Sequence, residues 1–228
     1  MSPTELVIAD DHPLFRAALR GAVEKMLHGV RIRECDSYSS LEQTMRQQGE
    51  VDLVLLDLNM PGARGFSALI HLRGEYPSVP VAIISAQEEP AVIRRAQDFG
   101  AAAFIPKSSS LDSIGSAVRS VLEGGEWWPK NIGEERPAER QLAANIASLT
   151  PQQLRVMLMI ADGVANKVIG ADLNITEGTV KAHVTAILRK LNLYRRTQLI
   201  VLTQKLLANR GEPFDLEHQA PGAGEAEE

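Results

Sequence analysis

The stretch VDLVLLDLNMPG, residues 51–62, decides the fold. Its apolar run has the length and the Val and Leu content of a strand buried on both faces, which is typical of a parallel sheet covered by helices. The run ends in Asp57, directly before a turn. Ligands of open α/β sheets bind at the carboxyl ends of the strands. We therefore expect Asp57 to lie in a functional site.

Four further short apolar runs accompany this one in the first half of the chain. Stretches with helical spacing separate them, and Gly124–Gly125 would stop the last helix, at about 110–123. Regular strand–helix alternation predicts a five-stranded, parallel, doubly wound (flavodoxin-like) α/β domain over residues 1–124. The five predicted strands are LVIA (6–9), VRIRE (30–34), DLVLLD (52–57), VAIIS (81–85) and AAFI (102–105).

The second half of the chain has a purely helical pattern. We expect a linker over 125–148 with one helical stretch at 138–147, then a small all-α domain over 149–210, and an acidic, disordered tail over 211–228. The all-α domain holds nine Lys and Arg against three Asp and Glu between residues 150 and 210, a net charge of +6. Such a charge suits a polyanionic partner. The expected helices are at about 151–162, 166–173, 177–191 and 195–208.

Composition narrows the class of protein. No apolar stretch reaches the ~20 residues of a membrane span, and the N-terminus lacks the pattern of a secretory signal. Cys35 is the only cysteine, which fits a reducing compartment. We therefore expect a cytoplasmic protein with no membrane partner.

Five polar residues follow the ends of the predicted strands. Because parallel strands end at one edge of the sheet, we expect these side chains to converge there. Three neighbouring carboxylates repel one another, so a cation is required; Mg²⁺ suits oxygen ligands, and a lysine adds a second positive charge. The five residues are Asp10, Asp11, Asp57, Ser85 and Lys107.

Each of these residues has a simpler explanation when it is taken alone. Asp10 and Asp11 would cap the following helix, because acids favour helix N-termini. Ser85 would be an ordinary hydroxyl at a strand end, and Lys107 a solvated lysine in a loop. The combination, spread over the ends of separate strands, favours a shared site.

Residues 1–123 resemble the receiver domain of bacterial two-component response regulators. By this resemblance Asp57 is the phosphoacceptor, with a sensor histidine kinase as phospho-donor. Asp11, Asp57 and the backbone carbonyl of Asn59 would bind Mg²⁺ directly, and Asp10 would act through water. The matching residues are Asp10–Asp11, LLDLNMPG (55–62), Ser85–Ala86, Gly100–Ala101, Phe104 and Lys107.

The chemistry of such a site follows from its residue types. A carboxylate attacks phosphorus in line, while Mg²⁺ and Lys107 neutralise charge on the transferring oxygens. We expect Ser85 to donate a hydrogen bond to the new phosphoryl group and Phe104 to rotate into the vacated space, as a two-state switch. The alternative for Phe104 is a plain core aromatic. The receiver would catalyse only its own phosphoryl transfer and slow dephosphorylation.

The stretch TEGTVKAHVTAILRKLN, residues 176–192, predicts an amphipathic helix. Val180, Val184, Ile187, Leu188 and Leu191 recur at helical spacing, and the opposite face is short, polar and basic. Basic faces are more often merely solvated than functional. A tight turn at LNI (173–175) and the short helix upstream favour a helix-turn-helix instead.

Residues 149–205 also resemble the LuxR-type DNA-binding domain. The resemblance is carried by LT (149–150), IADG (160–163), NKVIG (166–170), LNITEGTVKAHV (173–184), ILRKL (187–191) and RTQ (196–198). It places Lys181, Ala182 and Thr185 against base edges. The candidates for phosphate contacts are Lys167, Thr179, Arg189, Lys190 and Arg196.

This sequence departs from the LuxR-type pattern at two places. Gln152–Gln153 stands where Arg-Glu is frequent, so we expect a neutral hydrogen bond in place of an ion pair. Ala165 stands where Ser is usual and should leave a helix without its side-chain cap.

Together these features predict a phosphorylation-dependent transcriptional regulator of the NarL/FixJ class. Its resting receiver would mask helix 177–191; phosphorylation would release a homodimer, with helix 195–208 as a contact, that binds double-stranded promoter DNA. RNA polymerase is a candidate further partner. One alternative is a phosphatase or phosphotransferase with Asp57 as nucleophile, but residues 150–210 offer no cap that would enclose a substrate. The other alternative is a DNA-binding protein that acts independently of phosphorylation and uses its receiver only for dimerisation.

Overall fold

The computed structural model describes residues 3–47, 50–130, 132 and 137–207. Its N-terminal domain is a five-stranded sheet in which all strands are parallel, in the order β2-β1-β3-β4-β5. This confirms the predicted doubly wound fold. The strands are β1 (Glu5–Ala9), β2 (Arg31–Cys35), β3 (Leu53–Leu56), β4 (Val81–Ser85) and β5 (Ala103–Pro106).

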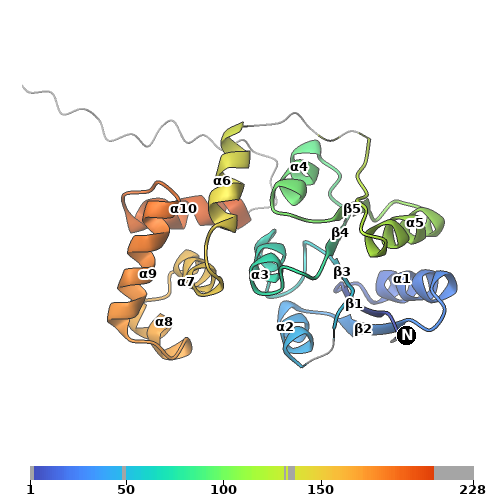
Figure 1. The fold of residues 1–228 in the computed structure, drawn as a ribbon, viewed down its shortest axis with the longest axis horizontal. Helices are drawn as coiled ribbons and strands as arrows, with labels where there is room; N and C mark the ends of the chain where they lie inside the picture. Colours follow the sequence, from blue (N-terminus) through green and yellow to red (C-terminus); the bar gives the residue numbers. More distant parts are fainter. Residues whose placement is uncertain (1–2, 48–49, 131, 133–136, 208–228) are drawn as a thin grey trace, which may run out of the picture.

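Helices cover both faces of this sheet (Figure 1). α1 and α5 pack on one face, where Leu19, Val23, Val118 and Val121 join one apolar cluster. The other three helices pack on the opposite face, in a second cluster. The helices of this domain are α1 (Pro13–Met26), α2 (Tyr38–Arg46), α3 (Ser67–Glu75), α4 (Pro90–Asp98) and α5 (Leu111–Leu122).

The central strands explain the continuous apolar runs in the sequence. Every residue of β3 and β4 is buried, since helices cover both faces of the sheet at its centre. The register pairs Ala9 with Leu56 and Ser85 with Pro106, so the carboxyl ends of neighbouring strands finish level with one another. This levelling places residues that follow the strands at one edge.

The C-terminal domain is helical, as predicted. Thr150 caps α7 through a capping box with Gln153, and Pro151 occupies the first helical position. The predicted helical stretch at 138–147 is confirmed as α6, and the predicted tail lies outside the described residues. The helices are α6 (Pro137–Ala147), α7 (Pro151–Ala161), α8 (Asn166–Asp172), α9 (Glu177–Lys190) and α10 (Arg196–Leu207).

The two domains pack directly against each other. α7 lies on α3, and α6 lies on α4 and α3 (Figure 1). The Arg155 guanidinium donates to both carboxylate oxygens of Glu75, at 2.9 and 2.6 Å, and one apolar cluster runs from the sheet into the helical domain. Across the described residues, no helix combines the length and apolarity that a bilayer crossing requires.

Candidate functional site

Asp10 and Asp57 lie side by side at the carboxyl edge of the sheet. Each follows its strand directly, and the Asp57 amide donates to the Ala9 carbonyl at 2.8 Å, which continues the pairing of β1 with β3. Both residues are only 2% exposed. The strand ends therefore bring these two carboxylates together, as the sequence predicted, and the structure adds that both are desolvated.

Lys107 links these two carboxylates. Its ammonium lies 2.7 Å from Asp10 Oδ2 and 2.8 Å from Asp57 Oδ2. Burial opposes the charge on this lysine, but the two carboxylates outweigh burial and raise the pKa of Lys107. Its backbone amide donates to the Ser85 carbonyl at 2.8 Å, so the end of β4 positions the backbone of Lys107.

Burial raises the pKa of Asp57, and the carboxylate of Asp10 acts in the same direction. The hydrogen bond from Lys107 and its charge act against this rise. Few water molecules compete for this buried carboxylate, and Lys107 is placed to neutralise charge on an incoming group. The geometry suits covalent chemistry at Asp57.

The residues at this edge fit a divalent cation. Ligand atoms of Asp10, Asp11, His12 and Asp57 all lie within 4.8 Å of one another. Asp11 Oδ1 is buried and accepts no hydrogen bond from the described part of the chain, although His12 Nδ1 is 2.7 Å away. Carboxylate oxygens are the ligands that Mg²⁺ prefers. Sequence reasoning gave His12 no role; its position next to the Asp pair was the available signal.

Ser85 and Phe104, the two residues of the predicted switch, are both buried in this structure. Ser85 is fully buried, and its hydroxyl accepts a hydrogen bond from the Gln87 amide at 3.1 Å. Phe104 is also fully buried, in the cluster on the α2–α4 face. The Phe104 ring is already inward in this conformation, so the choice between a switch residue and a plain core aromatic stays open. Asn59 is exposed, and its backbone amide donates a hydrogen bond to Asp57 Oδ1 at 3.3 Å.

The second predicted site is the outer face of α9. Val180 and Ile187 are fully buried and Leu191 nearly so, which confirms the apolar stripe, while Lys181, Ala182, Thr185 and Arg189 are exposed. Gly170 permits the tight turn between α8 and α9, because a Cβ there would lie 2.8 Å from the Ile175 carbonyl oxygen. Two short helices thus meet as in a helix-turn-helix.

The receiver does not cover this outer face. Contacts between the domains run through α6 and α7, and α9 lies on the side of α7 away from the sheet (Figure 1). The prediction that the receiver masks helix 177–191 is therefore wrong for this conformation. The first helices of the C-terminal domain provide the docking surface instead, and this arrangement leaves the polar face of α9 in solvent.

The predicted phosphate-contacting residues fall into two groups. Lys167, Thr179 and Arg189 are exposed. Lys190 instead donates to the Ser148 carbonyl at 2.6 Å and to Gln153 Oε1 at 2.9 Å. Arg196 donates to Asn166 Oδ1 at 2.7 Å and to the Val164 carbonyl at 2.8 Å. To contact phosphate, these two side chains would have to share or release bonds that hold the domain together.

The two departures from the LuxR-type pattern have different local results. Gln153 Oε1 accepts a neutral hydrogen bond from the Thr150 amide at 3.1 Å, as expected, but it also accepts a hydrogen bond from the charged Lys190 ammonium at 2.9 Å. Ala165 is the N-cap of α8, and no side chain caps that helix at this position. Neither change touches the exposed face of α9.

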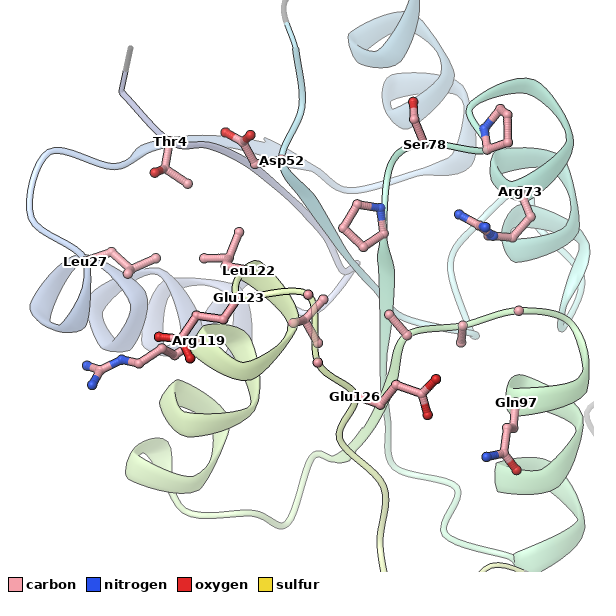
Figure 2. A pocket seen from close by; sticks show the side chains of 18 residues that line it. Thr4, Leu27, Asp52, Arg73, Ser78, Gln97, Arg119, Leu122, Glu123 and Glu126 are labelled. Carbon is pink, nitrogen blue, oxygen red and sulfur yellow. The ribbon is translucent and has the colours of Figure 1, made fainter. Parts of the chain in front are cut away.

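A cavity of about 870 Å³ opens at the other edge of the sheet (Figure 2). Two of its polar side chains bond to the backbone: Asp52 accepts from the Glu5 amide at 2.8 Å, and Arg73 donates to the Val79 carbonyl at 3.0 Å. These bonds hold chain segments together at the amino ends of the strands. The converging charged groups lie at the carboxyl edge instead.

Two family models match the chain. Residues 6–119 match the response regulator receiver domain, and residues 147–203 match the bacterial regulatory proteins of the luxR family. The Glycerol metabolism activator of Pseudomonas putida is 39% identical over 206 residues, which is 86% of this chain and 93% of that protein. The nitrate/nitrite response regulator NarP of Escherichia coli is 29% identical, over 88% of this chain and 94% of NarP.

Solved structures give the same architecture. RcsB from Salmonella enterica serovar Typhimurium, bound to a promoter in the presence of the phosphomimetic BeF₃⁻, superposes with a TM-score of 0.53 at 20% identity, covering 91% of this chain and 99% of that chain. A LuxR family DNA-binding response regulator from Silicibacter pomeroyi is 34% identical over 56% of this chain and 98% of its own, with a TM-score of 0.50. The protein therefore belongs to the NarL/FixJ class of DNA-binding two-component response regulators, with a receiver domain and a LuxR-type helix-turn-helix domain.

Proposed function

We propose that phosphorylation of Asp57 controls how this regulator binds promoter DNA. The observation that carries the proposal is the buried Asp57 carboxylate, held by Lys107 at 2.8 Å with the carboxylates of Asp10 and Asp11 beside it. The proposed domains are a receiver at 1–124, a linker at 125–148 and a DNA-binding domain at 149–210.

The phosphoryl donor in this proposal is the phosphohistidine of a sensor kinase. A carboxylate oxygen of Asp57 attacks phosphorus; the new O–P bond forms as the P–N bond to the histidine breaks, and the imidazole leaves with a proton. Lys107 then pairs with a phosphoryl oxygen, since it already reaches the carboxylate. Asp11, Asp57 and the Asn59 carbonyl would hold Mg²⁺, with Asp10 acting through water, and the bound ion would neutralise charge on the transferring oxygens.

The exposed face of α9 would read DNA in the major groove. Lys181, Ala182 and Thr185 would meet base edges, while Lys167, Thr179 and Arg189 would contact phosphates. Lys181 is paired with Glu177 at 2.8 Å on the exposed face, a weak ion pair that a base edge or phosphate can replace. A dimer through α10, where Val201 is an exposed apolar residue, would bind two half-sites.

Asp57→Asn tests the phosphorylation step. We expect this variant to take up no phosphoryl group from acetyl phosphate with Mg²⁺, as measured by intact mass, because an amide is not a nucleophile. Asp52→Asn is the matched control, since it removes an exposed carboxylate just before the same strand, and it should be labelled like wild type. Wild-type labelling of Asp57→Asn would refute the assignment.

Lys181→Ala tests the reading face. We expect this variant to lose discrimination between a selected site and random DNA by about 1–3 kcal/mol at fixed salt if the lysine contacts a base. Lys205→Ala removes an exposed lysine from α10 and should leave the specificity ratio unchanged. An unchanged ratio in Lys181→Ala would count against base contact.

One observation favours a second candidate function. The polar face of α9 is exposed, so the DNA-binding domain could act without phosphorylation while the receiver serves for dimerisation. Equal DNA affinity of Asp57→Ala and phosphorylated wild type would support this second function over the first.

A further inference from the structure

Residues 126–128 extend the sheet beyond β5. Trp127 pairs with Ala103 in parallel: its carbonyl accepts from the Phe104 amide at 2.9 Å, and its amide donates to the Ala102 carbonyl at 3.3 Å. Trp127 packs with the cluster on the α1 and α5 face, whereas Trp128 packs with the cluster on the opposite face. This alternation is that of a strand. Residues 126–128, here named the edge segment, therefore occupy the free edge of β5.

The turn after α5 directs the chain to this edge. Gly124 has a φ of +84°, and a Cβ on Gly125 would lie 2.8 Å from Ser120 Oγ and 3.1 Å from the Ser120 carbonyl oxygen. The Gly125 amide donates to that carbonyl at 2.8 Å, and Ser120 Oγ donates to the Glu126 carbonyl at 3.2 Å. Figure 2 shows this passage between Leu122 and Glu126. The positive φ of Gly124 and the missing Cβ of Gly125 allow this close return of the chain.

The edge segment leads into the docked helical domain. Trp128 and Ile132 pack against the same apolar cluster that contains Leu142 and Ile146 of α6. α6 in turn lies on α4 and α3 and precedes α7. Trp127 and Trp128 thus attach the chain before α6 to the sheet and to the cluster that α6 shares.

β5 also connects the edge segment to the phosphorylation site. Lys107 directly follows this four-residue strand and contacts Asp57 and Asp10. The backbone amide of Phe104, three residues earlier, donates a hydrogen bond to the Trp127 carbonyl. A phosphoryl group on Asp57 would displace the Lys107 ammonium from the carboxylate to the phosphoryl oxygens. Because β5 has only four residues, we expect a displacement of Lys107 to disturb the hydrogen bond between the Phe104 amide and the Trp127 carbonyl as well.

We propose that the edge segment is a clamp that keeps the DNA-binding domain docked, and that phosphorylation of Asp57 opens it. The proposal rests on the proposed function for its trigger, while the clamp itself rests on the pairing of Trp127 with β5. It accounts for control of the DNA-binding domain without burial of α9: the clamp limits where the domain can be placed, and its opening frees two domains to align on two half-sites.

Residue-resolved amide exchange of the full chain tests the clamp. The Phe104 amide faces the edge segment, whereas the Ala102 amide faces β4 and donates to the Val81 carbonyl at 2.8 Å, which makes it an internal control. Trp127→Ala should speed exchange of Phe104 about tenfold, through loss of the packing of a half-buried side chain, and should also speed exchange at Leu142 and Ile146. Trp127→Phe should keep wild-type protection. Unchanged protection of Phe104 in Trp127→Ala, or faster exchange confined to Phe104, would overturn the clamp.

Phosphorylation of the wild-type chain tests the trigger. With uptake at Asp57 verified by intact mass, exchange of the Phe104 amide should accelerate while that of Ala102 stays constant. Complete phosphorylation with unchanged Phe104 exchange would overturn the opening of the clamp and leave the proposed function standing. Failure of uptake would instead refute the proposed function and, with it, the trigger, and the clamp would then be judged on the Trp127 variants.

Discussion

At the scale of single residues, the site depends on side chains that begin where strands end. Asp10, Asp57 and Lys107 were predictable because each directly follows an apolar run, and a parallel sheet brings such positions to one edge. The buried state of Phe104 was not predictable, since a core aromatic and a switch share one residue type. Nor were the internal bonds of Lys190 and Arg196, because a sequence does not show which basic residues find backbone carbonyls within reach.

The raised pKa of Asp57 predicts a pH-dependent stability. Because the folded pKa lies above the unfolded value of about 3.9, the folded state holds the proton more tightly. Stability from this group is fully present below the unfolded pKa and is lost as pH rises through the folded pKa. In chelator-treated buffer, wild type should therefore lose free energy of unfolding relative to Asp57→Asn as pH rises through this window, as measured by urea unfolding. A difference between the two proteins that is independent of pH would contradict the assigned shift.

The missing cap of α8 predicts a stabilising substitution. Ala165 already has the extended backbone of an N-cap, with φ of −72° and ψ of 147°, but offers no side-chain acceptor. Ala165→Ser should raise the free energy of unfolding by about 1 kcal/mol. Ala171→Ser, on the exposed side of the same helix, is the control and should lower it slightly, because serine is a poorer helix former than alanine. Equal effects of the two substitutions would exclude capping as the cause.

At the scale of elements, helix positions followed from periodicity and caps, but the docking of α7 on α3 did not. Gly74 lets the two helices approach: a Cβ there would lie 2.7 Å from Leu154 Cδ2. In a sequence, a glycine within a predicted helix indicates lower helix stability and does not indicate a contact between helices. Its partner here, Leu154, is eighty residues away in sequence. Likewise, the two tryptophans after Gly124–Gly125 carried a strand signal inside a segment whose composition indicated a linker.

The ion pair between Glu75 and Arg155 predicts a charge-swap rescue. Arg155→Glu places two carboxylates in contact and should open the domain interface, as seen by a larger radius of gyration in solution scattering. The double variant Glu75→Arg/Arg155→Glu should restore the compact form. Because the Arg155 side chain is 40% exposed, the pair itself contributes only about 0.5 kcal/mol; the repulsion drives the effect. A double variant as extended as the single variant would show that the pair does not determine docking.

At the scale of the whole molecule, the two domains form one body through a shared apolar cluster and the edge segment. The sequence predicted two domains and the sign of their charges, because composition changes along the chain. The placement of the two domains depends on contacts between their surfaces, which hydrophobic periodicity does not encode. In this structure the polar face of α9 is exposed, whereas we expected the receiver to cover it. Under the proposed function, phosphorylation would then act on the position and freedom of the DNA-binding domain, because the outer face of α9 is already exposed.

DNA affinity as a function of phosphorylation tests the central claim most directly. At one salt concentration, with a DNA fragment selected by the phosphorylated protein, we expect phosphorylated wild type to bind about 5–150-fold more tightly than unphosphorylated wild type, the usual range of coupling between two sites. Asp57→Asn should bind like unphosphorylated wild type in the presence of the phospho-donor. Equal affinity of all three proteins, with uptake at Asp57 of the phosphorylated wild type verified by intact mass, would contradict control by phosphorylation.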